Sequence, residues 1–344
     1  MRFGHLLRPL ATGLLGLCLG LTPGTYGIPG FEDSTGWVNG APLAPRDLEG
    51  KVVLVEFWDY TCVNCLRTLP YLRTWYRRYH DDGFTIVGVH TPEFEFSGEQ
   101  KNVEAATRRL DIDWPVALDR KRAIWSRYGN VGLPHEYLFD QDGRLVDTIL
   151  GEGSYQETES KIQSLLKARN PKLELPPVMA LLPQDSYAKP GAICYLHTPS
   201  FLMNRSRIAS SATPDAPHAD GSVYLEGAWR VTADAAISAD GPTHLSLRYH
   251  AIEVVGVFAP PPSATVRVDV TQDGLPIAKS DAGADLRYDT DGTSFVTVDT
   301  ARAYELTMNA KMAFHELRLG PASSGLGVYS FAFESCEVPG SRPT

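Results

Sequence analysis

The sequence has 344 residues, of which 43% are hydrophobic and 21% are charged, with a formal net charge of −9. This composition excludes an intrinsically disordered or collagen-like chain, and the length is typical of about two domains. The acidic balance provides no basic surface for nucleic acid, so no nucleic-acid partner is expected. Five cysteines are too few for a disulfide-stapled scaffold, so each can be examined for a role of its own.

Residues 1–27 have the features of a secretory signal peptide. Arg2 and Arg8 supply positive charge, and an apolar run follows from Leu10 to Leu21. A membrane-spanning helix needs about 20 apolar residues, so this shorter run fits a signal peptide better, with an uncleaved membrane anchor as the alternative. Both interpretations place the protein in the periplasm or the cell envelope, where disulfides form and persist.

Residues 35–169 alternate patterns typical of strands and helices and predict an α/β domain. Val52–Trp58 is a nearly continuous apolar run, as expected for a central strand buried on both faces. A turn at 141–143 predicts a hairpin near the end of the domain. The predicted strands are 52–58, 85–90, 116–118, 136–140 and 145–150, and the predicted helices are 66–79, 99–110, 123–128 and 155–168.

Residues 170–190 are predicted to be a linker, and residues 191–338 a second domain. The linker is rich in proline, which stiffens it, and it lacks sustained periodicity. Beyond it, residues 245–249, 266–270 and 329–333 alternate apolar and polar side chains with a period of two. Short alternating strands separated by turn residues are typical of an all-β antiparallel sandwich, which we expect to be jelly-roll-like.

Cys62 and Cys65 form a C-x-x-C motif just after the first predicted strand, where a helix is expected to begin. Disulfide exchange needs a thiolate, and the free amides and positive dipole of a helix N-terminus stabilise that anion. We therefore expect Cys62 to be the exposed nucleophile and Cys65, one turn further, to resolve the mixed disulfide. The alternatives are half of a zinc site, for which no second metal-ligand pair follows, and an inert structural disulfide.

Glu56 lies six residues before Cys62, in a strand that is otherwise apolar. A buried carboxyl has a raised pKa and can take up and return a proton near neutral pH, as thiol chemistry requires. The alternative is a solvent-facing acid at the end of the strand.

The segment from Phe57 to Pro70, together with residues 89–94, 114–119 and 151–153, resembles the thioredoxin superfamily. Within it, the likeness is to the TlpA-like and DipZ-like thiol-disulfide oxidoreductases and covers roughly residues 35–168. It implies a thioredoxin-like fold, the roles given above to the two cysteines and the acid, and a cis peptide bond at Pro134. Residues from about 190 are more loosely similar to the β-sandwich of this family, which is likened to carbohydrate-binding modules. The residues expected to shape the site are Trp58, Asp59, Tyr60, Thr61, Val63, Asn64 and Leu133.

The sequence departs from the usual family pattern at two places near the cysteines. Asp59 stands where Thr is usual, and if it lies close to the thiols its charge raises their pKa and favours a more reducing couple. Residues 133–137 are Leu-Pro-His-Glu-Tyr, where the family usually has Trp-Pro-Ala-His-Tyr.

Family members often carry a membrane electron-transfer domain upstream, whereas only the signal-like segment precedes this domain. The resemblance therefore implies that reducing equivalents come from a separate membrane protein of the CcdA/DsbD type. No cofactor and no metal ion are expected.

Cys194 and Cys336 flank the predicted second domain. If its first and last strands are neighbours, the two thiols can form a stabilising disulfide, and the alternative is two unpaired or intermolecularly bonded thiols. Trp229, Tyr249 and Tyr329 of this domain could form a sugar-binding face, although aromatic residues of a sandwich more often lie in its core.

These features predict an exported thiol-disulfide oxidoreductase that exchanges disulfides with protein partners through Cys62-Val63-Asn64-Cys65, as a reductase more than an oxidase. The alternative is an envelope binding protein whose β-sandwich captures a ligand, such as a carbohydrate, while the Cys pair is structural. A thiol peroxidase is disfavoured because the P-x-x-x-T-x-x-C context of peroxiredoxins is missing at both cysteines.

Overall fold

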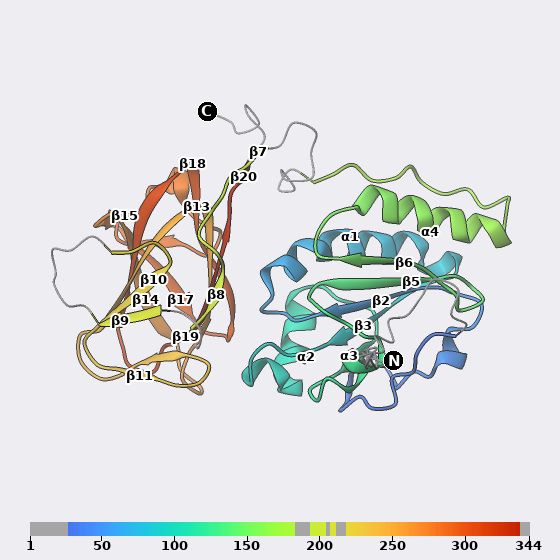
Figure 1. Cartoon of the computed structure of the whole chain (residues 1–344), viewed down its shortest axis with the longest axis horizontal. Helices are drawn as coiled ribbons and strands as arrows, with labels where there is room; N and C mark the ends of the chain where they lie inside the picture. The colour runs from blue at the N-terminus through green and yellow to red at the C-terminus, as the bar shows by residue number, and fades with distance from the viewer. Residues whose placement is uncertain (1–26, 183–192, 204–206, 211–217, 338–344) are drawn as a thin grey trace, which may run out of the picture.

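The computed structural model describes residues 27–182, 193–203, 207–210 and 218–337, which form two domains side by side (Figure 1). The N-terminal α/β domain has a sheet with helices on both faces, and the C-terminal β-domain is built almost entirely of strands. The predicted signal peptide, apart from residue 27, lies outside the described residues, as does the second part of the predicted linker. In the described part of the chain, no helix is long and apolar enough to cross a membrane.

The sheet of the α/β domain has its described strands in the order β1-β4-β3-β2-β5-β6. The central β2 pairs in parallel with β3 and antiparallel with β5, which forms the predicted hairpin with β6. Strand β1, which pairs with β4, is two residues long and too short to give a periodic signal in the sequence. The strands are β1 (Trp37–Val38), β2 (Val52–Trp58), β3 (Phe84–His90), β4 (Val116–Leu118), β5 (His135–Phe139) and β6 (Leu145–Leu150).

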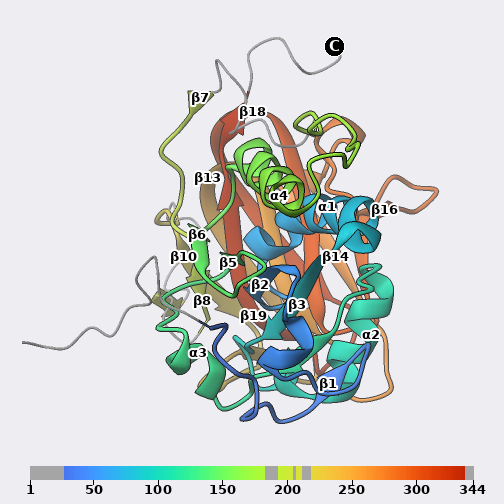
Figure 2. The ribbon, with the colours of Figure 1, turned by 90° about the vertical axis from the view of Figure 1, so that its right-hand side faces the viewer.

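Helices cover both faces of this sheet (Figure 2). Helices α1, α2 and α4 enclose one core, to which they contribute Leu69, Val103 and Ile162. Helix α3 and the first described residues enclose the core on the opposite face, which contains Ile124 and Phe31. The helices are α1 (Val63–Tyr79), α2 (Gln100–Arg109), α3 (Ala123–Arg127) and α4 (Tyr155–Arg169), with short 3₁₀ turns at Pro45–Leu48, His80–Asp82 and Phe96–Gly98.

The α/β domain extends beyond the predicted range 35–169 at both ends. Ile28 and Phe31 are buried in its core. After α4, the first part of the predicted linker packs against the domain, and the amide of Leu182 donates to the hydroxyl of Tyr71 (2.9 Å). Apolar side chains within this proline-rich stretch therefore make it part of the domain surface.

Helix α1 begins at Val63, three residues before the start that the apolar periodicity predicts. Cys62 is its N-cap, and the sulfur of Cys62 accepts a hydrogen bond from the amide of Cys65 (3.2 Å). Cysteine is not one of the usual capping residues, which are Ser, Thr, Asp and Asn, so the C-x-x-C motif and not a cap residue predicted the helix start at Cys62.

Apart from β7 and β20, the named strands of the β-domain form one large hydrogen-bonded sheet that is antiparallel except for the β9–β10 pair. The long strands β13 and β18 pair along most of their length, and β10, β14 and β19 join their edges. Alternate residues of β13, among them Leu245, Leu247 and Tyr249, point into one apolar core, as the period of two predicted. The strands are β7 (Ile193–Cys194), β8 (Phe201–Leu202), β9 (Arg207–Ser210), β10 (Ser222–Glu226), β11 (Trp229–Val231), β12 (Ala236–Ser238), β13 (His244–Ala259), β14 (Val266–Gln272), β15 (Leu275–Pro276), β16 (Arg287–Tyr288), β17 (Ser294–Val298), β18 (Arg302–Pro321), β19 (Gly327–Glu334) and β20 (Cys336–Glu337), with a 3₁₀ turn at Lys279–Asp281.

The two ends of the β-domain meet in a small separate sheet. Strand β7 pairs antiparallel with β20, with Cys194 opposite Cys336, and a disulfide joins these two residues. The first and last described strands of the domain are thus neighbours.

An apolar contact joins the two domains. Val255 and Val257 of β13 pack with Phe94 of the α/β domain. The ring of Tyr329 on β19 lies edge-on against Phe94 and Phe96, at centroid distances of 5.3 and 4.7 Å. This contact places the β-domain against the carboxyl end of β2 and the start of α1 (Figure 1).

Candidate active site

Cys62 and Cys65 are joined by a disulfide at the start of α1, just beyond the carboxyl end of β2. Cys65 is fully buried in the core beneath the helix. Cys62 belongs to the same core but lies at its edge, where it lines a cleft. The outer and inner positions of the two sulfurs are therefore those that the sequence pattern predicted.

A cleft of about 500 Å³ between the two domains leads to Cys62. Residues 61–64, Glu93 and Leu133 form its wall on the α/β domain, and residues 200–202 and 330–332 form its wall on the β-domain. The side chain of Cys62 is only 8% exposed, which differs from the exposed nucleophile that we expected. The β-domain covers this end of the α/β domain, and the sequence of the motif gave no sign of that cover.

The peptide bond between Leu133 and Pro134 is cis, as the resemblance implied. Leu133 lines the cleft together with Cys62, and Pro134 is buried just before β5. Strand β5 pairs with β2 so that His135 lies opposite Phe57. This pairing brings the loop before β5 to the same end of the sheet as the two cysteines.

Glu56 is fully buried near the centre of the sheet, which excludes the solvent-facing alternative. It alternates along β2 with residues of the other face, so it points with Leu54 and Trp58 toward the core that contains Cys65. Among the described residues, neither carboxyl oxygen of Glu56 has a hydrogen-bond partner. Burial, and after it the charge of Glu136, raises the pKa of Glu56 well above its usual value. Its surroundings therefore favour the protonated form of Glu56.

Asp59 is fully buried, and its hydrogen bonds anchor the loops around the site. One carboxylate oxygen accepts from the amide and hydroxyl of Thr61 (2.7 and 2.8 Å), and the other accepts from the amide of Glu93 and the hydroxyl of Ser97 (both 2.7 Å). Burial raises the pKa of Asp59, but His90, at 3.7 Å, and these hydrogen bonds outweigh that effect and lower it overall. Asp59 is therefore an ionised anchor between two loops, and its expected effect on the thiol pKa stays a prediction.

The other predicted site-shaping residues divide into two groups. Trp58 and Tyr60 are buried and hold the ring of His90 between them, edge-on at 5.3 Å and stacked at 5.5 Å. Val63 and Asn64, between the two cysteines, line the cleft instead. The first group supports the site from behind, and the second forms part of the surface that a partner would meet.

Glu93 is a cleft residue that the sequence analysis did not select. Its side chain reaches solvent, and it lines the cleft with Cys62. Desolvation by the surrounding protein, followed by the charge of Asp59, raises the pKa of Glu93 to about 7, against the opposing effect of Arg122. A lone acid in a loop carries no pattern, and only the hydrogen bond from its amide to Asp59 brings it to this site.

Arg67, in the second turn of α1, binds three carboxylates, and two of them belong to the β-domain. Its guanidinium lies 2.7 Å from Glu253 on β13, 3.2 Å from Glu334 on β19 and 3.4 Å from Glu152 of its own domain. The Arg67 side chain is 18% exposed. Its β-domain partners are 186 and 267 residues away in the chain, so no sequence pattern predicts this contact.

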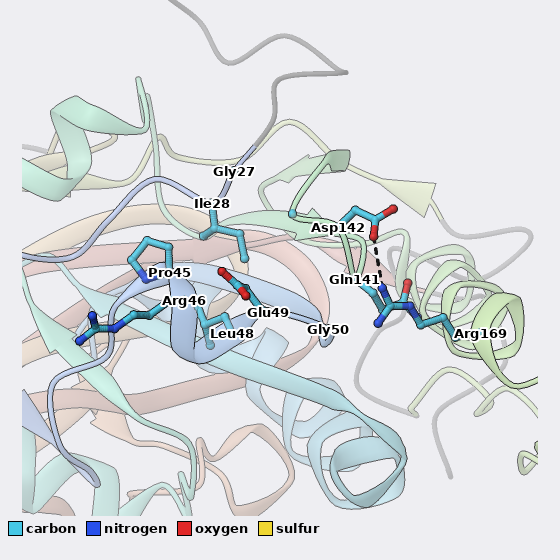
Figure 3. Close-up of a pocket in the computed structure, with 11 residues that line it drawn as sticks. Gly27, Ile28, Pro45, Arg46, Leu48, Glu49, Gly50, Gln141, Asp142 and Arg169 are labelled. Carbon is cyan, nitrogen blue, oxygen red and sulfur yellow. Dashed lines mark hydrogen bonds and ion pairs between the residues drawn. The ribbon is translucent and has the colours of Figure 1, made fainter.

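A second cavity, of about 610 Å³, lies at the other end of the α/β domain (Figure 3). Asp142 and Arg169 line it and form an ion pair (3.2 Å). It adjoins Gly50, just before β2, whereas Cys62 follows the far end of that strand. The length of β2 separates the two places by about 20 Å, so this cavity is not part of the cysteine site.

The three aromatic residues considered as a sugar-binding face do not share an exposed face. Tyr249 is fully buried in the core of the β-domain, and Trp229 packs against that core. Tyr329 is part of the contact between the domains. Over the described ranges, no group of three or more His, Cys, Asp and Glu residues is arranged to hold a metal ion.

Two protein-family models match the chain, one for each domain. The Redoxin model matches residues 24–166, and the model described as "Thioredoxin like C-terminal domain" matches residues 203–333. The first covers most of the α/β domain with its C-x-x-C pair, and the second covers most of the β-domain.

Similar proteins agree with these matches. DipZ from Mycobacterium bovis is 30% identical over 321 residues, which are 89% of this chain and 42% of DipZ, so the chain spans less than half of that relative. The thiol-disulfide oxidoreductase ResA from Bacillus cereus is 30% identical over 128 residues, which are 37% of this chain and 71% of ResA. A solved thiol-disulfide isomerase from Corynebacterium glutamicum is 26% identical, with a TM-score of 0.37, over 39% of this chain and 92% of that one. The match to ResA, 30% identical over 71% of that protein, shows that the chain belongs to the thioredoxin-like thiol-disulfide oxidoreductases.

Proposed function

We propose that this protein exchanges disulfides with protein partners, with Cys62 as the nucleophile and Cys65 as the resolving thiol. One observation carries the proposal: Cys62 caps α1, its sulfur accepts the amide of Cys65, and its side chain also borders the cleft. The free amides and the dipole at this helix end favour a thiolate over a thiol at Cys62 once the disulfide is reduced.

The burial of Cys65 supports its role as the resolving thiol. Its side chain has no exposed surface, so a client cannot reach it directly. It can attack only a sulfur that is already attached to Cys62, which is the step that releases the client.

We assign to Glu56 the proton transfer that accompanies this step. When the disulfide opens, Cys65 becomes a thiolate inside an apolar core, and an unneutralised charge there is costly. Glu56 faces the same core, and burial raises its pKa and so favours its protonated form. It can therefore give a proton to Cys65 and later take it back.

The cleft favours a particular kind of client. Cys62 is nearly covered and opens into a space of about 500 Å³ between two domain walls. A loop or an unfolded segment fits such a space, whereas a folded domain does not. We therefore propose that the substrates are disulfides on exposed loops or on incompletely folded chains.

We further propose that the protein is exported and works as a reductase, supplied by a separate membrane electron donor of the CcdA/DsbD type. The signal-like residues 1–27 and the likeness to TlpA-like and DipZ-like proteins support this direction. A reduction potential near that of thioredoxin, about −270 mV, is the expected result. A value above about −150 mV assigns the protein to the oxidases instead.

Trapping with Cys65→Ser tests the exchange reaction. Cys62 can then capture a client but nothing releases it, so mixed disulfides accumulate and identify the partners. Cys62→Ser is the matched control and should trap nothing. Adducts that form only through Cys194 or Cys336 would show that the assignment of roles is wrong.

The insulin reduction assay separates this proposal from a binding protein with a structural Cys pair. Wild-type protein with a reductant should reduce insulin much faster than Cys62→Ser does. Equal rates would favour the binding protein.

A further inference from the structure

A second buried carboxyl, Glu136, lies beside Glu56 in the sheet. Strands β2 and β5 are antiparallel, and these two residues are direct partners in their register. Directly opposed side chains of an antiparallel pair lie on the same face, with Cβ atoms about 5 Å apart. The two residues are 0% and 3% exposed, so both side chains lie inside the protein, although no hydrogen bond joins the two carboxyls.

This pair of carboxyls faces the core that contains the inner cysteine. Leu54 lies two residues from Glu56 on β2, and Leu138 lies two residues from Glu136 on β5. Both leucines belong to the core beneath α1, which also holds Cys65. Because side chains two apart on a strand share a face, both carboxyls point to the Cys65 side of the sheet.

The charges of the pair are coupled. Burial, followed by the charge of Asp147, raises the pKa of Glu136 to about 8, and the charge of Glu136 in turn raises the pKa of Glu56. Burial therefore favours the protonated form of both carboxyls, and a charge on Glu136 favours the protonated form of Glu56 further.

Asp147 on β6 continues the row of carboxyls to the surface. The β5–β6 register places it opposite Leu138, so it shares a face with Glu136 and lies one diagonal step away. Its side chain is 25% exposed and forms an ion pair with Lys161 of α4 (2.8 Å). The ionisable groups beside Glu136 on this face of the sheet include Glu56 from β2 and Asp147 from β6, which pairs with Lys161 from α4. The sulfur of Cys65 from α1 belongs to the core on the same face.

We infer that Glu136 is the second member of a proton relay, which passes protons between Glu56 and the surface at Asp147 while the Cys62–Cys65 disulfide opens and closes. The inference rests on the proposed function. Glu136 acts through Glu56 and is therefore a positioning residue for the reaction.

The relay completes the proton balance of the reductive step. A thiolate of a donor dithiol bonds to Cys62, the bond between the two protein sulfurs breaks, and its electron pair goes to Cys65. Glu56 protonates this thiolate, Glu136 reprotonates Glu56, and water restores the proton of Glu136 by way of Asp147. The second donor thiol loses its proton to water and displaces Cys62 as a thiolate, and the donor leaves as a disulfide. Reduction of a client disulfide runs the same transfers in reverse.

Glu136→Gln tests the relay, because the amide keeps the size of the side chain but cannot carry an acid proton. The measurement is the rate at which dithiothreitol opens the internal disulfide between pH 6 and 9, followed by tryptophan fluorescence. We expect this rate to fall about tenfold near neutral pH. Glu136→Asp should restore most of it. In a Glu56→Gln protein, adding Glu136→Gln should cause no further loss.

Glu159→Gln is a matched control, since Glu159 is another fully buried carboxyl of this domain but hydrogen-bonds to Tyr79 and Arg78. It should leave the rate unchanged. The relay is wrong if Glu136→Gln alters the rate less than twofold, or if it slows the Glu56→Gln protein as much as the wild type.

If Glu136→Gln does not fold, Asp147→Asn at the surface end provides the same test. We expect a loss of about threefold that a higher concentration of a small buffer acid restores, and an unchanged rate contradicts the relay. Opening by dithiothreitol needs no client, so a failed relay leaves trapping by Cys65→Ser intact. Failed trapping with a working relay would count against the proposed function alone.

Discussion

The protein has two described disulfides, Cys62–Cys65 and Cys194–Cys336, whose structural surroundings differ. Cys62 and Cys65 are 3 residues apart. Cys62 caps a helix and borders a cleft between the domains, and Cys65 is buried beneath that helix. Cys194 and Cys336 are 142 residues apart and join two short strands at the ends of the β-domain. The first disulfide lies at a helix terminus and shares its core with a buried acid, Glu56, whereas the second joins a pair of strands.

The difference shows that the reactivity of a disulfide and its contribution to the stability of the fold depend on different features. In the chain-entropy model, stabilisation grows with the loop that the bond closes, from about 2 kcal/mol for the short loop to about 5 kcal/mol for the long one. Thiolate stability depends instead on nearby amides, charges and proton carriers. The bond that stabilises less is therefore the one prepared for exchange.

Loss of the Cys62–Cys65 pair should abolish activity, and loss of the Cys194–Cys336 pair should not. We expect Cys62→Ser to reduce insulin no faster than the reductant does alone, because no thiolate remains at the helix end. Replacing Cys194 and Cys336 together by Ser should leave the rate within a factor of two. The comparison breaks if the second variant loses activity while its α/β domain stays folded by circular dichroism.

Loss of the Cys194–Cys336 pair should lower the free energy of unfolding more than loss of the Cys62–Cys65 pair does. Removing the Cys194–Cys336 bond should lower the free energy of unfolding of the β-domain by about 5 kcal/mol, against about 2 kcal/mol for the α/β domain without the Cys62–Cys65 bond. Urea unfolding followed separately for each domain measures both values. A larger loss from the short loop would contradict the argument from chain entropy.

Arg67→Met tests the cover that only the Cys62–Cys65 disulfide has, because the contacts of Arg67 hold the β-domain against the end of the α/β domain where Cys62 lies. The substitution leaves Glu253 and Glu334 without their cation, at a cost of about 3 kcal/mol in the contact between the domains. Cys62 in the reduced protein should then react faster with a bulky maleimide. Arg77→Met is the control on the same helix, since Arg77 pairs at the surface with Asp111, and it should not change that reaction. Equal reactivity in both variants would mean that Arg67 does not hold the cleft closed.

Glu93→Gln should give the smallest effect. Above pH 7, Glu93 is ionised, and its charge in the cleft disfavours the Cys62 thiolate. The variant should therefore lower the apparent pKa of the Cys62 thiol by about half a unit, because solvent screens the exposed charge. Below pH 6, where Glu93 is neutral, iodoacetamide should alkylate both proteins at the same rate. A difference of the same size at all pH values would point to a steric cause.

Local patterns in the sequence predicted the order of strands and helices in the α/β domain and the position of its two cysteines at a helix start. The sequence predicted Val52–Trp58 as a central strand because a run of seven nearly all apolar residues is typical of a strand that is buried on both faces of a sheet. The spacing of the two cysteines after it fixed which sulfur lies inside. The cis bond at Pro134 came from the resemblance, since spacing alone does not distinguish it from a trans bond.

The sequence by itself determined the α/β order, the β-rich second half and the Cys pair, because each depends on periodicity or spacing between near neighbours. Only the tertiary structure decided that Glu56 lies opposite Glu136, that Arg67 binds two carboxylates of the other domain, and that the β-domain covers Cys62. These contacts join residues far apart in the chain. They depend on the register between strands and on the docking of two folded surfaces, and a local pattern encodes neither.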